Sequence, residues 1–194
     1  MAQHLPLVWS SLIDHSLEIC WIATDGPTWT FEGAATLIEG AVPFSLTYVL
    51  LLDRQTGLTR FDGRIRGGTS PERAIAISGS LGAEWRIQGG DDESLAALES
   101  GTCIDLGWTP LTNTFSIWHL DLAVGECADI VNAWVPFPQI VLIPAVQRYT
   151  RVGERRYRYE QPETDFAADL DVDEFGFVRS YEGIWKRVST SDGA

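Results

Sequence analysis

Apolar and polar residues alternate in short runs along most of the chain, and this pattern predicts many β-strands. The alternation is clearest in residues 45–50 and 156–160, where apolar or aromatic side chains occupy every second position. Successive side chains on a strand point to opposite faces, so one face packs against a core and the other meets water. Gly153, followed by Glu154, suits a hairpin turn. The runs predicted as strands are residues 28–38, 45–53, 58–66, 73–78, 83–88, 103–108, 128–135, 141–152, 155–161, 166–172 and 177–186.

Helix is predicted at two short segments only. Residues 91–99 carry acidic side chains in their first turn, where the helix dipole favours negative charge. In residues 113–120, Phe115 and Trp118 are three positions apart and would share one helix face. Thr112 or its neighbour would cap that helix, although the same residues also fit a strand. The sequence therefore predicts an all-β, mainly antiparallel protein with little helix.

Composition favours one folded domain. Of the 194 residues, 45% are hydrophobic and 21% are charged, which is the balance of a globular protein. The 18 glycines and 9 prolines are spread along the chain instead of marking a linker. We expect a single domain over residues 1–188 and a flexible tail over residues 189–194.

The net charge of −13 limits the classes of partner. A surface this acidic repels phosphate backbones and anionic lipids, so nucleic acid is not an expected partner. The longest uninterrupted apolar run is residues 48–52, far shorter than a membrane-spanning helix. Arg54 is the first basic residue, so no positively charged segment precedes an apolar one as in a secretory signal. These features predict a cytoplasmic protein without a membrane segment.

The cysteines and acidic residues do not predict a metal site. Cys20, Cys103 and Cys127 are odd in number and far apart, which indicates buried, reduced thiols. Residues 169, 171 and 173 are aspartates at the first, third and fifth positions of a calcium-loop pattern, but Glu174 and Ser180 replace the required Gly and Glu. We expect instead a strand in which these aspartates face water while residues 170 and 172 point inward. Neither metal nor cofactor is predicted.

Catalytic motifs are not evident. His4, His15 and His119 do not lie in a nucleophile or metalloprotease motif, and the paired glycines do not form a phosphate loop. The combination of Asp105, His119 and Arg148 is the one plausible set of base, acid and anion-holding groups. An enzyme acting on a small hydrophobic or sugar-bearing substrate is therefore kept as an alternative to a binding protein.

Five arginines are concentrated in one segment of this acidic chain. They could bind a phosphate or carboxylate, because guanidinium groups form paired hydrogen bonds to anions. We favour cross-strand pairing with the acidic residues of 163–174, with Arg148 as the exception. The five are Arg148, Arg151, Arg155, Arg156 and Arg158.

Aromatic residues are frequent in the central part of the chain. Trp108, Trp118 and Trp134 lie close in sequence to Phe115 and Phe137, with polar residues between them. Such a mixture can stack on sugar rings or line a cavity, and it can also be ordinary core packing, which is the favoured interpretation.

Three motifs give a more specific indication. The segments Cys-Ile-Asp-Leu at residues 103–106, Thr-Pro-Leu-Thr-Asn-Thr at 109–114 and Gln-Arg-Tyr-Thr-Arg at 147–151 resemble, in order and spacing, a bacterial family of glycolipid-binding proteins. The resemblance is strong over residues 80–188 and weaker in the first 80 residues. It implies a spiral β-roll, in which a long antiparallel sheet wraps around a short helix. It also implies a non-catalytic protein that holds the acyl chain of a lipid or glycolipid in the apolar interior of the curled sheet.

Within this framework, the polar residues of the motifs are candidates for the binding site. Their hydroxyl and amide groups are of the kind that bond to sugar hydroxyls, and they could equally cap a helix and satisfy buried backbone groups. A partner-binding protein without a ligand is a further alternative, and exposed strand edges would permit a homodimer. The candidate ligand-binding residues are Thr112, Asn113, Thr114, Trp118, His119, Gln147, Arg148 and Tyr149.

Overall fold

A computed structural model describes residues 2–3, 6–92, 97–98 and 101–188. Within this part of the chain, one helix, α1 (Asn113–Leu120), accompanies a single sheet. The strands are β1 (Ala2–Gln3), β2 (Leu7–Ser11), β3 (Leu17–Asp25), β4 (Thr28–Glu39), β5 (Val42–Asp53), β6 (Thr59–Gly67), β7 (Arg73–Gly79), β8 (Trp85–Gln88), β9 (Ala97–Leu98), β10 (Ile104–Leu106), β11 (Cys127–Val135), β12 (Ile143–Gly153), β13 (Arg156–Gln161), β14 (Phe166–Val172), β15 (Val178–Tyr181) and β16 (Trp185–Arg187).

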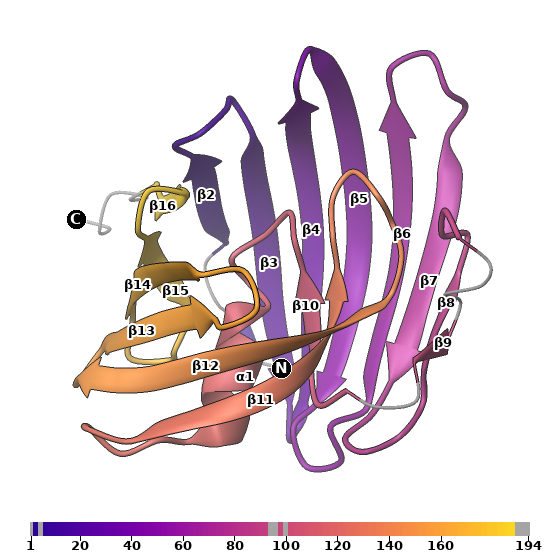
Figure 1. The fold of residues 1–194 in the computed structure, drawn as a ribbon. Coiled ribbons are helices and arrows are strands. Elements are labelled where there is room, and N and C mark those ends of the chain that lie inside the picture. Colours follow the sequence, from indigo (N-terminus) through magenta and orange to yellow (C-terminus); the bar gives the residue numbers. More distant parts are fainter. Residues whose placement is uncertain (1, 4–5, 93–96, 99–100, 189–194) are drawn as a thin grey trace.

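The sheet is long, curled and open. Its strand order is β10-β11-β12-β13-β14-β15-β16-β2-β3-β4-β5-β6-β7-β8-β9, with β1 paired to β3. Every pair between the described strands is antiparallel except β10 with β11. Figure 1 shows β3 to β7 as one wall, with β11 to β13 crossing in front of it and α1 at their lower end. The predicted all-β fold and curled antiparallel sheet around a short helix are confirmed.

Local sequence pattern accounts for most of these elements. Strand β14 has the predicted bounds and α1 occupies residues 113–120 as expected, while β2 and β3 were not predicted. The run at 177–186 divides into β15 and β16, because Gly183 adopts a positive φ of 73° in the turn between them. The helix predicted at 91–99 is wrong for those residues of the segment that the structure describes, since Ala97–Leu98 form β9. Residues 93–96 and 99–100 of that segment, and the predicted tail at 189–194, lie outside the described residues.

Helix α1 is held between two distant parts of the sheet. Phe115 packs against Phe31 of β4 with ring centroids 5.3 Å apart, and Trp118 packs against Trp29 of the same strand at 4.7 Å. From the other side, Asn113 hydrogen-bonds to Tyr149 of β12. Complete burial of one large apolar side chain stabilises a fold by roughly 1.5–3 kcal/mol, so α1 contributes to the core of both walls.

The arginine-rich segment pairs mainly with nearby acidic residues, as the favoured interpretation predicts. Arg156 and Arg158 both contact Asp169, with nitrogen–oxygen distances of 2.6 and 3.1 Å. Arg155 lies 3.5 Å from Glu174. Arg151 instead donates to two backbone carbonyl oxygens, those of residues 122 and 154. The side chains in these ion pairs are 26–55% exposed, so each ion pair stabilises the fold little.

Two expectations about individual side chains are wrong. Asp173 does not face water, because its carboxylate is 6% exposed and accepts backbone hydrogen bonds from Phe175 and Phe177. It follows β14 and shapes the turn into β15, while Leu170 and Val172 point inward as predicted. Cys127 is exposed at the start of β11, whereas the other two cysteines are buried; all three are free thiols.

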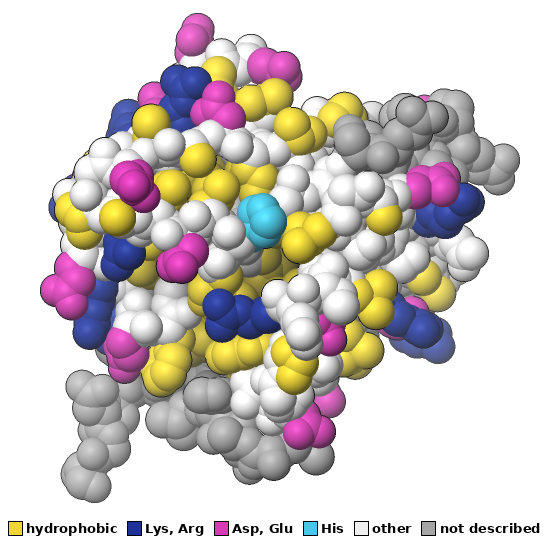
Figure 2. Space-filling model, turned by 90° about the horizontal axis from the view of Figure 1, so that it is seen from below, with side chains coloured by type: hydrophobic (Ala, Val, Ile, Leu, Met, Phe, Trp, Pro, Cys, Tyr) yellow, Lys and Arg dark blue, Asp and Glu magenta, His cyan; other side chains and the backbone are white. Residues whose placement is uncertain are grey.

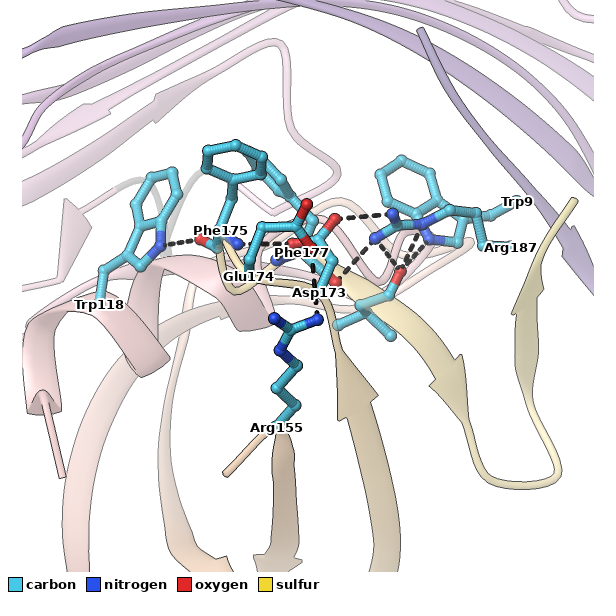
Figure 3. A network of polar contacts seen from close by, with 9 residues as sticks. Trp9, Trp118, Arg155, Asp173, Glu174, Phe175, Phe177 and Arg187 are labelled. Carbon is cyan, nitrogen blue, oxygen red and sulfur yellow. Dashed lines mark hydrogen bonds and ion pairs between the residues drawn. The ribbon is translucent and has the colours of Figure 1, made fainter. Parts of the chain in front are cut away.

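Asp173 belongs to a polar cluster that joins strands β2 and β16 (Figure 3). Arg187 of β16 contacts it at 2.7 Å and also donates to the carbonyl oxygens of Phe177 and Val178. Trp9 of β2 donates to the same Val178 oxygen at 2.8 Å. Trp118 of α1 donates to the carbonyl oxygen of residue 175 at 2.6 Å. The cluster therefore ties β2, β16, the β14–β15 turn and α1 together.

We expect Arg187→Ala to lower the free energy of unfolding by about 3–5 kcal/mol, because the carboxylate of Asp173 would stay buried without its cation. Urea denaturation monitored by tryptophan fluorescence measures this change. Arg179→Ala is the matched control, since Arg179 is an exposed arginine of neighbouring β15. Adding Asp173→Asn to Arg187→Ala should recover part of the loss, because the buried charge is then removed. Equal stability of the Arg187 and Arg179 variants would contradict this account.

Candidate functional site

A cluster of buried polar side chains lies at the N-terminal end of α1. Its centre is Asp105 of β10, which is 8% exposed. Thr112 donates its hydroxyl to one carboxylate oxygen at 3.2 Å, and Gln147 of β12 donates its amide to the other at 2.5 Å. The Thr112 hydroxyl also accepts the backbone N–H of Leu106 at 3.0 Å, which links the helix start to β10. Thr112 is the N-cap residue of α1. Its hydroxyl group donates to Asp105 and makes no capping hydrogen bond to the helix backbone.

The cluster continues across the inner face of β11 and β12. Asn113 donates to the hydroxyl of Tyr149 at 3.0 Å, and that hydroxyl lies 3.3 Å from the amide oxygen of Gln147. Asn132 of β11 donates to Gln147 and to Ser116, both at 2.8 Å. Because each of these side chains is buried, their hydrogen bonds fix one arrangement of the helix against the sheet.

Burial raises the pKa of the Asp105 carboxyl, and its hydrogen bonds from Gln147 and Thr112 act in the opposite direction. Within the described residues, no cation lies within salt-bridge distance of it. Asp105 is thus a buried hydrogen-bond acceptor without an ion-pair partner among the described residues, and a further hydrogen-bond donor beside it would be favoured.

Glu18 of β3 is a second buried carboxyl group. It accepts the hydroxyl of Tyr48 at 2.5 Å and the hydroxyl of Thr109, and burial raises its pKa to about 7. Tyr48 is on β5, so its ring must cross β4 to reach Glu18. Gly33 makes this possible, since a Cβ at that position would lie 2.0 Å from the Tyr48 ring. Glu18 thereby anchors the loop before α1 to the opposite wall of the sheet.

A pocket of about 230 Å³ lies beside Asp105. Its polar groups come from Asp105, Thr109, Asn113 and Gln161. The rings of Tyr159, Phe166 and Tyr181 contact one another along one wall, with centroids 5.9–6.3 Å apart. We call this site the aromatic pocket, and its remaining lining residues are Leu106, Gly107, Trp134, Phe137, Ile184 and Trp185.

The structure brings together half of the candidate ligand-binding residues. Thr112, Asn113, Gln147 and Tyr149 are all in the buried cluster, and Asn113 also lines the aromatic pocket. Thr114 is buried nearby, and its hydroxyl has no hydrogen-bond partner within the described part of the chain.

The other candidates lie elsewhere. Trp118 and His119 are at the C-terminal end of α1, where they line a different pocket. Arg148 alternates with Gln147 and Tyr149 along β12, so it points to the outer face and pairs with Asp129 at 2.6 and 2.9 Å. The alternative catalytic set is likewise separated, because Asp105 is buried at one end of α1, His119 is exposed at the other, and Arg148 faces outward.

Sequence reasoning missed Glu18 and most of the aromatic wall. Glu18 occupies an inward position of β3 between buried neighbours, so a polar residue on an apolar face was the available signal. Tyr159 and Tyr181 lie in predicted strands and in segments that share the family resemblance, but they were not among the candidate ligand-binding residues, and their approach to Asp105 depends on the curl of the sheet. Among the described residues, no group of three His, Cys, Asp or Glu side chains could hold a metal ion.

Comparison with known proteins agrees with the motif resemblance. A family described as "Putative glycolipid-binding" matches residues 6–187. The chain belongs to this family. The crystal structure of a DUF1089 family protein from Pseudomonas aeruginosa is similar to this member of the family, with a TM-score of 0.73 and 26% identity over 90% of this chain and 93% of that one. No curated protein matches the chain.

None of the helices in the described residues is long and apolar enough to cross a membrane.

Glu18 should make the free energy of unfolding fall as pH rises from about 4.5 to about 7. Its pKa is about 7 in the folded protein and near 4.5 in the unfolded chain, so the unfolded state loses its proton first. The resulting decrease in the free energy of unfolding is complete above the folded pKa and amounts to roughly 3 kcal/mol. Glu18→Gln should remove it, because the amide stays neutral and Thr109 can accept its N–H. The gain over wild type should be small at pH 5 and largest at pH 8.

Urea denaturation across that pH range measures the effect. Glu39→Gln is the control, because Glu39 is an exposed carboxyl group at the end of β4. A gain for Glu18→Gln that is the same at pH 5 and pH 8 would show that Glu18 does not titrate in this range.

Proposed function

We propose that this protein binds a glycolipid without chemical conversion, with one sugar of the headgroup in the aromatic pocket. The first methylenes of the acyl chain would continue from the sugar along the apolar side chains of the same pocket, within the curl of the sheet. The observation that carries this proposal is the buried carboxylate of Asp105 beside a wall of aromatic rings. The family match supports a glycolipid as the ligand class.

The chemistry of the pocket suits a sugar. A sugar ring has apolar C–H faces that stack on aromatic rings, and hydroxyl groups around its edge that need hydrogen-bond partners. The aromatic pocket is lined by Tyr159 and Tyr181, together with Asp105, Asn113 and Gln161, whose side chains carry carboxyl and amide groups. A hydroxyl donating to Asp105 would form a charge-assisted hydrogen bond, which is stronger than one between neutral groups.

The volume and the charge of the aromatic pocket restrict the class of ligand further. The volume of about 230 Å³ is below the range of roughly 300–1,000 Å³ that is usual for drug-sized ligands, so a single sugar fits better than a whole lipid. The aromatic pocket itself contains the carboxyl group of Asp105 and is lined by no basic residue. A neutral sugar avoids the repulsion that an anionic headgroup would meet.

The apolar part of the pocket supports the placement of the acyl chain. Phe137, Phe166 and Ile184 provide apolar surface next to the polar groups. Each methylene buried against such surface would contribute about 0.8 kcal/mol. A ligand with both a sugar and an alkyl chain should therefore bind more tightly than the free sugar.

Octyl β-glucoside, used below its micellar concentration, is a suitable probe for isothermal titration calorimetry. We expect saturable binding, and weaker binding of free glucose. Gln161→Ala should weaken binding up to about tenfold, because a hydrogen bond between neutral groups contributes about 0.5–1.5 kcal/mol. Asp105→Asn should weaken it about tenfold or more, because a hydrogen bond to a charged group contributes about 1.5–3 kcal/mol. Gln161 is only half-buried, so its variant should fold even if Asp105→Asn is destabilised.

Arg148→Ala is the matched control in this experiment. Arg148 is on β12, one residue from Gln147, but faces outward and pairs with Asp129. Its variant should bind the glucoside with wild-type affinity. Unchanged affinity in a stably folded Gln161→Ala variant, or a loss only in Arg148→Ala, would refute the placement of the sugar in the aromatic pocket.

A further inference from the structure

A second pocket lies at the opposite end of α1 from the aromatic pocket. It is narrow, with a volume of about 80 Å³, and its apolar walls include Leu52, Leu81, Cys103 and Phe115. By volume it could hold about five waters, or a similar number of methylene groups. It shares no lining residue with the aromatic pocket. The eight residues of α1 separate the two sites by roughly 12 Å along the helix axis.

The mouth of this narrow pocket carries one positively charged group. Arg54, in the turn between β5 and β6, lies over the ring of Trp118 with its guanidinium carbon 4.4 Å from the ring centroid. Among the described residues, no carboxylate is within salt-bridge distance of Arg54. The ring of Trp118 covers one face of the guanidinium group. The N–H groups lie at the edge of the guanidinium plane and point away from the ring.

The narrow pocket opens beside a wider groove of about 550 Å³, and both include Arg54 and Trp118 in their walls. Figure 2 views the molecule from this lower side and shows a hollow with hydrophobic side chains in its floor and a basic side chain and a histidine beside it. The other arginines of the groove already have partners, since Arg151 donates to backbone oxygens and Arg155 pairs with Glu174. Arg54 is the arginine of this groove that retains its full capacity to bind an anion.

We propose that this end of the molecule binds an alkyl carboxylate of medium length. The end of the alkyl chain would enter the narrow pocket between Leu52, Leu81 and Phe115, and the carboxylate would meet Arg54 in the groove. An apolar hole with a guanidinium group that has no ion pair at its mouth is complementary to a molecule with one apolar and one anionic end. Because the site is separate from the aromatic pocket, this inference does not depend on the proposed sugar binding.

Sodium octanoate, titrated into the whole protein at neutral pH, is the first probe. Tryptophan fluorescence is a direct readout, since Trp118 lies under Arg54, and calorimetry gives the affinity and stoichiometry. We expect saturable binding of one octanoate in the millimolar range or tighter. Arg54→Gln should weaken binding about tenfold, and 1-octanol, which lacks the charge, should bind wild type about tenfold more weakly than octanoate.

Two controls assign the binding to this site. Arg66→Gln removes another exposed arginine that has no ion pair among the described residues, so it should bind octanoate like wild type. Gln161→Ala, in the aromatic pocket, should also leave octanoate affinity unchanged. Loss of octyl glucoside binding in that variant with retained octanoate binding would separate the two sites.

Three results would overturn the proposal. The first is no saturable octanoate binding by wild type in the millimolar range. The second is equal affinity of Arg54→Gln and wild type for octanoate. The third is binding of octyltrimethylammonium as tight as that of octanoate, which would assign the groove to cations through its acidic residues Asp121 and Glu154.

Discussion

The buried carboxylate of Asp105 imposes the strongest constraint on this structure. A carboxyl group removed from water needs hydrogen bonds to compensate for the lost hydration, and here they come from Thr112 at the start of α1 and Gln147 on β12. The helix, the short strand β10 and the far wall of the sheet are thus held in one arrangement. That arrangement also places one edge of the carboxylate beside the aromatic pocket. The same interaction therefore positions the helix and supplies the polar group to which a ligand could bind.

The curl of the sheet depends on contacts between residues far apart in sequence. Glu18 accepts hydrogen bonds from Tyr48 and Thr109, which join the first wall of the sheet to the loop before α1. Arg187 and Asp173 join the last strand to the β14–β15 turn, and β16 pairs directly with β2. An antiparallel sheet of many strands could remain flat and extended or close into a barrel. These polar contacts select a curled form that leaves space for α1 and for a pocket at each end of it.

The sequence predicted the parts of this structure that depend on local pattern. Period-two alternation identified most strands, and the spacing of Phe115 and Trp118 identified α1. The motif resemblance selected Thr112, Asn113, Gln147 and Tyr149, which meet in one cluster. Arg148 was grouped with them although its neighbours on β12 face inward, and the alternation of a strand already implies that it faces outward.

Other features could not be predicted because they arise from the curl. The aromatic wall of Tyr159, Phe166 and Tyr181 approaches β10 only when strands distant in sequence are folded over α1. Asp173 was expected to face water because aspartates alternate along β14, but Arg187, fourteen residues later, makes its burial favourable. The stacking of Arg54 on Trp118 likewise joins a turn and a helix that no sequence pattern connects.

The central claim is that a sugar binds beside Asp105, and a crystal structure of the protein with octyl β-glucoside tests it most directly. The account predicts the sugar ring against Tyr159 and Tyr181, with a hydroxyl group donating to the carboxylate of Asp105 and the octyl chain along Phe166 and Ile184. A glucoside bound elsewhere, with the aromatic pocket holding only water, would contradict it.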